Sequence, residues 1–592
     1  MLSIRRARGR WRKAAAALAL LLAATPRLAR AAPAPADTFA YDIVGDVNTL
    51  DPHWQYDSVS HTVAWQAYET LIFYRGTSIK DFDPLIASVV PTRENGLVTA
   101  DGLRYTFPIR KGVRFHDGSL LTPADVKYSL LRFLLMDRAG GGSGVLLEPI
   151  LGLQSTRDGQ GRLRNGVFEA ADGAVRIEGQ AVVIELEGPF APFLQIVAAF
   201  CPIVSKSWIV AHGGWDGTAA QLPKLNNIPK ESSPLYDRIN GTGPFTLESW
   251  DRKEKRLALV RFDKYWRGAA RLKRLVFKTV DDAAARRERL ASGEADATML
   301  ERQFAPQFET LPGVTVEDEL PLLEVNNAFV FNQRIDPADN PDIGSGKLDG
   351  GGIPPDFFAD ADLRRAFAQA FDYEGYIREG CRGKAQKARG PIPAGVSGYD
   401  ESMHVPAFNP SRAAELFQSA WKGRVWQQGF KLAVAYEQGR GDRRLACEIL
   451  KRGVETLNPK FKIECRAVLF STWLGRFVQG KYPLVCARWA LDYPDPHNAV
   501  QPFLDSQGYF AKATGYSNVR ADRLIREAAV ELEPDHRNAL YRELQALAAI
   551  DLPAFFTVDT YGLRVYRSNV RDWAYNPMLD YGYFYPVYKE GP

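Results

Sequence analysis

The sequence lacks the residue patterns that mark common catalytic and metal sites. Its seven histidines are scattered and none lies in an HExxH motif, so a zincin-type hydrolase has no support. There is no GxSxG elbow, since the nearest run at 141–145 ends in valine, and no GxGxxG to bind a dinucleotide. The five cysteines form no CxxC pair. We therefore expect no catalytic residue, cofactor or metal, and a secreted hydrolase with an unrecognised site is the least favoured function.

Long hydrophobic runs are also missing, apart from one near the N-terminus. Five arginines and Lys13 precede an 11-residue apolar run at 14–24, and Ala29-Arg30-Ala31 then forms a small-x-small site. This pattern predicts a Sec signal peptide over 1–31, cleaved near Ala32, rather than an uncleaved anchor, with Ala34-Pro35-Ala36 as a second candidate site. No cysteine follows the apolar run, which argues against a lipoprotein. Because no later stretch reaches 18 apolar residues, we do not expect an integral membrane protein.

The basic balance of the chain belongs to this export segment. Residues 1–31 contain eight of the 75 basic residues and no acid, so removing them leaves 67 basic residues against 70 acidic ones. A slightly acidic mature chain gives no reason to expect a nucleic-acid partner. In an oxidising compartment the five cysteines allow one or two disulfides.

The remaining chain alternates short strand patterns with amphipathic helix patterns. At 592 residues it is too long for one hydrophobic core, and the alternation predicts α/β lobes. Residues 103–109 predict a half-buried strand, and Pro108 favours an edge position because it cannot donate to a ladder. Helices are expected to begin at Pro123 and Pro410, each preceded by a capping residue, and a third over 361–371.

Several motifs follow one another in a recognisable order over some 500 residues. Residues 105–132 read YTFPIRKGVRFHDGSLLTPADVKYSLLR, which resembles the signature of the family 5 extracellular solute-binding proteins, the dipeptide- and oligopeptide-binding group. The other matching segments are NTLDP at 48–52, YETL at 68–71, GTGPF at 241–245, YW at 265–266, LASGEAD at 290–296, NAFVFN at 327–332, WALDYPDP at 489–496 and GYSN at 515–518. The resemblance covers nearly the whole chain after the export segment.

The resemblance implies a two-lobed periplasmic binding protein of type II, cluster C. The base of the first lobe would comprise 32–75, 238–320 and 553–592, and an additional subdomain would comprise 76–237. The second lobe would comprise 321–552, so the C-terminal segment returns to the first lobe. The end of the second lobe reads DLPAFFTVDT, which departs from the apolar strand common in the family, but we still expect a strand there.

The resemblance also implies a function. The chain would be the periplasmic substrate-binding component of an ABC importer, a monomer that closes on small peptides and delivers them to an inner-membrane permease and ATPase complex. The alternative is the same fold with a non-peptide solute such as an opine, an oligosaccharide or a metal chelate, since a fold does not fix the ligand.

A peptide carries an ammonium group and a carboxylate, and burying either one unpaired is costly. Asp492 stands where the family places the carboxylate that holds the α-amino group; its alternative role is that of a turn aspartate before Pro494. Trp489 either lines the cleft or packs in the core. Asp495, before Pro496, is interpreted as a structural residue, in a turn or as a helix N-cap.

Arginines are the candidates for the ligand carboxylate, which a guanidinium binds bidentately. Arg488 takes that role or pairs with a nearby acid. Arg440, Arg443 and Arg444 follow a predicted strand and are further candidates. His497 has no second histidine nearby in the sequence, so we predict no metal site around it.

Overall fold

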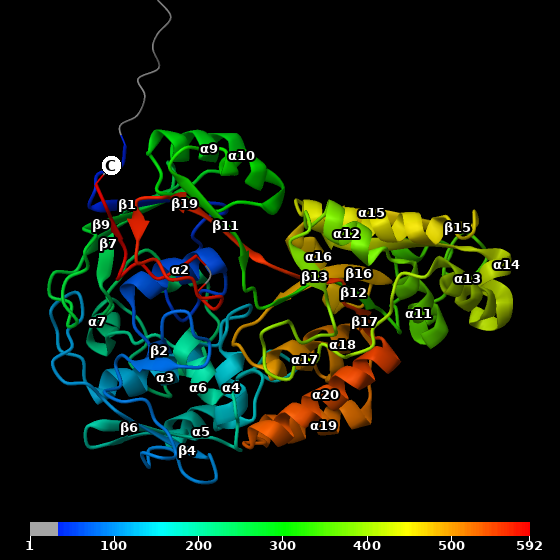
Figure 1. The fold of residues 1–592 in the computed structure, drawn as a ribbon. Coiled ribbons are helices and arrows are strands. Elements are labelled where there is room, and N and C mark those ends of the chain that lie inside the picture. The colour runs from blue at the N-terminus through cyan, green and yellow to red at the C-terminus, as the bar shows by residue number, and fades with distance from the viewer. Residues whose placement is uncertain (1–32, 580, 592) are drawn as a thin grey trace, which may run out of the picture.

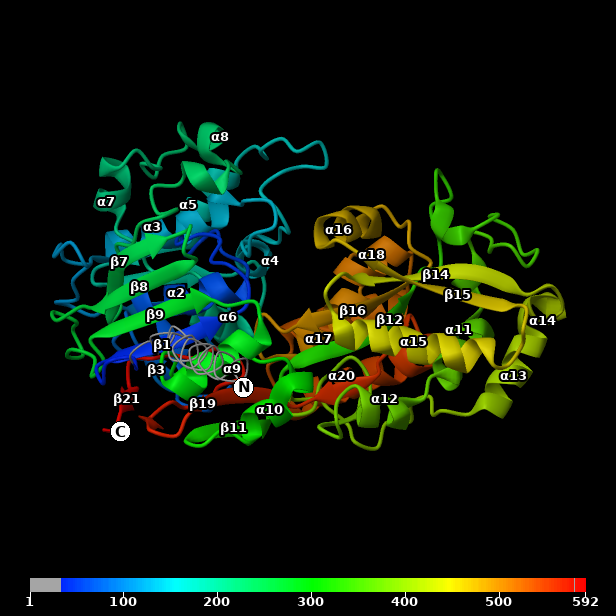
Figure 2. The ribbon, with the colours of Figure 1, turned by 90° about the horizontal axis from the view of Figure 1, so that it is seen from above.

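The computed structural model describes residues 33–579 and 581–591, so the predicted signal peptide at 1–31 lies outside the described residues. These residues form two bodies side by side, each with a seven-stranded sheet (Figures 1 and 2). Within this part of the chain, no helix is both long and apolar enough to cross a membrane.

The sheet of the first body combines strands from three distant parts of the chain, in the order β11-β19-β10-β1-β9-β8-β7. Its strands are β1 (Thr38–Ile43), β7 (Phe245–Asp251), β8 (Arg256–Arg261), β9 (Arg274–Thr279), β10 (Ala297–Thr298), β11 (Val314–Leu320) and β19 (Gly562–Arg567). The helices of this body are α2 (Ser58–Ala67), α9 (Ala283–Ser292) and α10 (Ala305–Glu309). Phe39 and Tyr41 of β1 lie on one face of the sheet with Phe277 of β9, and this face is a buried apolar core.

A smaller unit around a three-stranded sheet, β4-β6-β5, covers the lower side of the first body in Figure 1. The strands here are β2 (Ile72–Tyr74), β3 (Phe82–Pro84), β4 (Arg104–Pro108), β5 (Val175–Glu178) and β6 (Ala181–Glu185). The helices are α3 (Pro123–Met136), α4 (Gly144–Leu151), α5 (Val167–Ala174), α6 (Phe193–Ala199), α7 (Lys206–Ala211) and α8 (Leu222–Leu225). As Pro108 predicted, β4 is an edge strand of this sheet. The predicted cap of α3 is confirmed, with the Asp125 carboxylate accepting the backbone N–H of Thr122 at 3.0 Å.

The second body contains the sheet β13-β18-β12-β16-β14-β15, with β17 also paired to β12. Its strands are β12 (Glu324–Phe331), β13 (Ala385–Lys387), β14 (Phe430–Glu437), β15 (Phe461–Val468), β16 (Leu484–Ala490), β17 (Ala554–Phe555) and β18 (Val558–Thr560). Its helices are α11 (Ala361–Ala370), α12 (Tyr373–Glu379), α13 (Pro410–Ser419), α14 (Arg424–Gln428), α15 (Gly441–Glu455), α16 (Phe470–Val478), α17 (Pro496–Leu504), α18 (Tyr509–Thr514), α19 (Val519–Val530) and α20 (Pro534–Asp551). Both helices predicted in this region form, as α11 and α13, and Asn409 caps the latter by accepting the Arg412 N–H at 3.0 Å.

The chain crosses between the two sheets twice, after β11 and before β19. The second crossing lies further along the chain than the predicted boundary at 553, because β17 and β18 both pair with β12 of the second body. The cause is packing: Phe555 stacks on Phe329 with ring centroids 4.7 Å apart, in the second core. The return to the first lobe therefore begins after Thr560. The other limits of the proposed division (32–75, 76–237, 238–320 and 321–552) stay predictions.

All five cysteines lie within the described residues and all are free thiols, so neither of the disulfides that the sequence allowed is formed. Four of them are buried, and burial raises the pKa of the Cys201 thiol.

Candidate functional site

Asp492 lies in the turn that joins β16 to α17, at an edge of the second sheet. Its backbone N–H donates to the Asn498 side-chain carbonyl at 2.8 Å. The turn is fastened by Asp495, which caps α17 by accepting the His497 N–H at 2.8 Å and forms a buried two-bond ion pair with Arg537 at 2.8 and 2.7 Å. The interpretation of Asp495 as an N-cap is confirmed. A buried ion pair of this kind holds the position of the residues around it, here the Asp492 backbone.

The Asp492 carboxylate is held by neutral donors from both bodies. Tyr56, just before α2 in the first body, donates its hydroxyl hydrogen to Asp492 at 2.7 Å, and the Asn498 amide lies 3.4 Å from the other carboxylate oxygen. Burial raises the pKa of Asp492 to about 6, although both hydrogen bonds lower it. Within residues 33–579 and 581–591, no basic side chain forms an ion pair with this carboxylate. The negative charge at neutral pH is therefore unneutralised.

Trp489 is linked to the same amide. Its indole N–H donates to the Asn498 carbonyl at 3.2 Å, so Asn498 positions both the Trp489 ring and the Asp492 backbone. The Trp489 ring is half-buried and contacts Tyr509 and Phe510, with centroids 5.7 and 5.9 Å apart. The structure thus places Trp489 beside Asp492, partly in the core and partly exposed.

Arg488 is paired with an acid of its own body. Its Nε lies 2.8 Å from the Glu324 carboxylate, on the neighbouring strand β12. Glu324 stands opposite Ala490 in the ladder, so this ion pair lies at the same sheet edge as Asp492. The pairing takes up part of the guanidinium, while 36% of the Arg488 side chain remains exposed.

Arg440 and Arg443 share one acidic partner. Both guanidinium groups contact Glu437 at the end of β14, at 3.3 Å for Arg440 and 2.9 Å for Arg443. Arg443 is 8% exposed, whereas the Arg440 side chain is 49% exposed. Because β14 and β16 are parallel neighbours, their carboxyl ends lie at one sheet edge, which brings this group to the edge that carries Asp492. Two cations on one carboxylate leave one positive charge in excess.

Five of the six candidates therefore lie at one edge of the second sheet, but only Trp489 and Asp492 are joined through a common partner. The sixth, Arg444, is exposed and pairs with Glu448 on its own helix at 3.7 Å. Two residues that contact Asp492 were not predicted. Asn498 lies six positions after Asp492 and could have been found as the first amide after the WALDYPDP segment. Tyr56 is separated from Asp492 by 436 positions, and nothing in its local sequence indicates the contact.

His497 behaves as a packing residue. Its Nδ1 lies 3.0 Å from the Tyr493 hydroxyl, and its ring meets Phe190 of the smaller unit edge-on. Burial lowers the pKa of His497. Among the described residues, no group of three or more His, Cys, Asp or Glu side chains is arranged to hold a metal ion.

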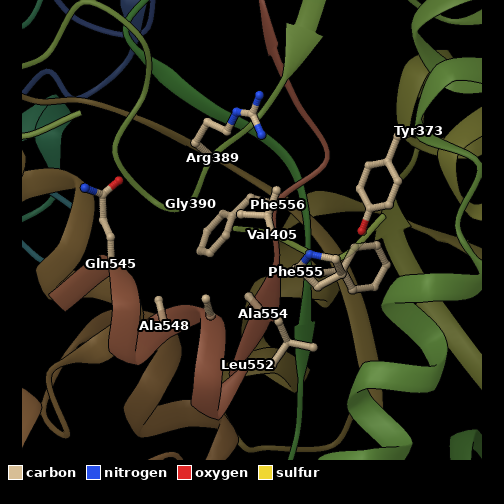
Figure 3. A pocket seen from close by; sticks show the side chains of 12 residues that line it. Tyr373, Arg389, Gly390, Val405, Gln545, Ala548, Leu552, Ala554, Phe555 and Phe556 are labelled. Atoms are coloured by element: carbon tan, nitrogen blue, oxygen red, sulfur yellow. The ribbon is translucent and has the colours of Figure 1, made fainter. Parts of the chain in front are cut away.

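Two cavities lie away from Asp492. One, of about 20 Å³, lies in the second body beside α20 and β17, and Gln545, Phe556 and Val405 are among the residues that line it (Figure 3). The other, of about 260 Å³, lies on the outer face of the first sheet between Arg256, Lys278 and Arg289. Neither contains any of the five predicted site residues.

The chain crosses twice between two α/β bodies, and Tyr56 and Asp492 join them. This arrangement defines the class of two-lobed solute-binding proteins. The comparisons with known proteins agree. The model of the bacterial extracellular solute-binding proteins, family 5 (middle region), matches residues 92–511. The chain belongs to this family.

Relatives match over nearly the full length. The chain is 24% identical to the probable D,D-dipeptide-binding periplasmic protein DdpA of Escherichia coli K12, over 95% of this chain and 96% of that protein. It is 23% identical to heme-binding protein A of Haemophilus influenzae, over 89% of this chain and 87% of that protein. The chain also superposes on the structure of the periplasmic binding protein DppA from Helicobacter pylori in complex with the peptide STSA. The TM-score is 0.71 at 21% identity, over 94% of this chain and 98% of that structure. The predicted fold class is thereby confirmed.

Proposed function

We propose that this chain is the substrate-binding component of an ABC importer and captures small peptides between its two lobes. The observation that carries the proposal is the Asp492 carboxylate, partly buried between the lobes and held by Tyr56 and Asn498 without a cation. A ligand ammonium would supply the missing positive charge. Because Tyr56 belongs to the first lobe, the ammonium would bind where closure brings the lobes together.

The arginines offer a partner for the other end of a peptide. Arg440 is more exposed than Arg443 and Arg488 and shares Glu437 with Arg443, so it can bind a carboxylate without leaving Glu437 unpaired. Arg488, with its Nε on Glu324, is the second candidate. We assign the α-ammonium to Asp492 beside Trp489, and the α-carboxylate to one of these arginines.

The cellular setting follows the family. We propose export through the signal peptide at 1–31, a periplasmic monomer, and delivery to an inner-membrane permease and ATPase complex. Support comes from the family membership and from DdpA, whose name describes it as periplasmic. Members of the family bind solutes, and in this proposal the chain performs no catalysis.

A non-peptide solute is the second candidate. It is favoured by the ion pairs of Arg440, Arg443 and Arg488, since each of these cations already has an acidic partner within the protein. A solute with an ammonium group but no carboxylate would match this arrangement better than a peptide. Heme-binding protein A shows by its name that relatives are not restricted to peptides.

Native mass spectrometry of freshly purified protein separates the two candidates. A bound mass series that fragments into amino acids supports peptides. A single bound mass without amino-acid fragments would instead support the non-peptide solute, and calorimetry with a dipeptide panel then provides the second measurement.

A further inference from the structure

Five aromatic rings form a continuous row from the surface of the second lobe to Asp492. Phe470 stacks on Trp473 and Trp473 on Phe477 along α16, with centroids 6.3 and 5.1 Å apart and planes 13° and 6° from parallel. Phe477 contacts Tyr509 at 5.5 Å, and Tyr509 contacts Trp489 at 5.7 Å. We call Phe470, Trp473, Phe477, Tyr509 and Trp489 the aromatic row.

The outer part of the row is exposed, which is unusual for side chains of this kind. Phe470 is 56% exposed, and Leu469 and Val478, at either end of α16, are 61% and 62% exposed. Tyr509 is 37% exposed, at the start of α18. A cluster of exposed large apolar side chains marks a surface that something covers.

The position of the row indicates what covers it. Both views place α16 on the side of the second lobe that faces the first lobe (Figures 1 and 2). The inner end is Trp489, whose indole N–H shares the Asn498 carbonyl with the Asp492 backbone. Burial and Asp492 raise the pKa of the Tyr56 hydroxyl, and Tyr509 is among the groups that add to this shift. Trp473 and Phe477, in the middle of the row, are only 6% and 2% exposed, so Phe470 connects through buried rings to Tyr509 and to Trp489 beside Asp492.

We propose that the aromatic row is the subsite for a large apolar or aromatic side chain of the bound solute. This inference rests on the proposed function and deepens it: the preferred ligands are peptides that carry a bulky apolar residue close to their free amine. The ammonium binds Asp492, and the apolar side chain packs along Trp489, Tyr509 and α16. Aromatic rings suit such a subsite because they offer a large rigid surface at low conformational cost.

The test is calorimetry on the mature protein with dipeptides X-Ala and Ala-X, where X is Ala, Leu, Phe or Asp. Covering one large apolar side chain should strengthen binding about 10- to 100-fold. We therefore expect Leu or Phe, in at least one position, to bind at least tenfold more tightly than Ala, and Asp to bind more weakly. Phe470→Ser should reduce this preference, because Phe470 is part of the row.

Val519→Ser is the matched control, since Val519 is also an exposed apolar side chain, 79% exposed on α19, but is not part of the row. Equal affinity for all the dipeptides would overturn the subsite and leave the peptide function intact, whereas failure of every dipeptide to bind would overturn both. If Phe470→Ser keeps the preference but abolishes uptake in cells, α16 is a docking surface for the permease and the inference is wrong.

Discussion

The hydroxyl of Tyr56 donates a 2.7 Å hydrogen bond to the carboxylate of Asp492, and the two residues belong to different lobes. A hydrogen bond to a charged acceptor contributes about 1.5–3 kcal/mol, enough to shift the equilibrium between the open and closed forms. It also fixes the carboxylate that the ligand ammonium would bind. This single contact therefore connects closure with recognition.

Tyr56→Phe removes the contact and keeps the ring. We expect the ligand-free protein to open, with a larger radius of gyration in small-angle X-ray scattering. The affinity for a peptide should fall less than tenfold, because the ammonium–carboxylate pair remains. Tyr585→Phe is the control, since that hydroxyl bonds the Arg267 carbonyl within the first lobe. Equal radii for both variants would show that Tyr56 does not hold the lobes together.

Ligand affinity should depend on pH through Asp492. Its pKa is raised to about 6, and only the ionised carboxylate attracts an ammonium group. A peptide should therefore bind about tenfold more weakly at pH 5 than at pH 7, with proton release on binding near pH 6. Calorimetry in buffers of different ionisation enthalpy measures this release. Asp492→Asn should abolish the dependence; if it persists in that variant, another group is responsible.

Asp492 and Asp495 should have opposite effects on stability. The folded protein holds a proton on Asp492 more tightly than the unfolded chain does. The stability that this protonated carboxyl contributes to the folded protein is therefore lost as the pH rises from about 4 to about 6. Asp492→Asn should then raise the free energy of unfolding by about 1–2 kcal/mol at pH 7. Asp495→Asn should lower it by about 3–5 kcal/mol, because it leaves Arg537 buried without its partner.

Chemical denaturation at pH 7 and at pH 4 measures both effects. The difference between wild type and Asp492→Asn should vanish at pH 4. A loss of stability in Asp492→Asn at pH 7 would mean that Asp492 is a structural turn residue.

Arg440→Gln tests the carboxylate partner. If Arg440 binds the peptide carboxylate, converting that carboxylate to an amide should weaken binding to the wild type about 10- to 100-fold, and to the variant much less. Arg452→Gln is the control, because Arg452 is also exposed on α15 but lies in its last turn and pairs with Glu379. If amidation costs the same in wild type and Arg440→Gln, the partner is another group, and Arg488→Gln is the next variant to compare.

Local sequence patterns predicted the elements well and the long-range contacts poorly. The capping residues Thr122 and Asn409 act through the few residues that follow them, so their helices could be predicted directly. The second crossing lies a few residues past the predicted boundary at 553, because Phe555 belongs to a strand whose partner, Phe329, lies far away in the sequence. No local pattern records such a pairing.

The same limit applies to the site. Asp492, Trp489 and Arg488 were predicted because each stands in or next to a family motif, and Arg440 and Arg443 because they follow a predicted strand. Glu324 and Tyr56 were not, since an acid on a neighbouring strand and a tyrosine from the other lobe approach only after folding. The aromatic row was missed for a similar reason, because Tyr509 and Trp489 come from separate elements.

The central claim is that Asp492 binds the α-ammonium of a peptide, and one double-mutant cycle tests it directly. Calorimetry would compare wild type with Asp492→Asn, each with a dipeptide and with its N-acetylated form. Breaking a buried ion pair costs about 3–5 kcal/mol, or roughly 100- to 4,000-fold in affinity. We predict that acetylation weakens binding to the wild type by that factor and to Asp492→Asn by less than tenfold, which gives a large coupling energy. A coupling near zero would contradict the account and remove Asp492 from the ligand site.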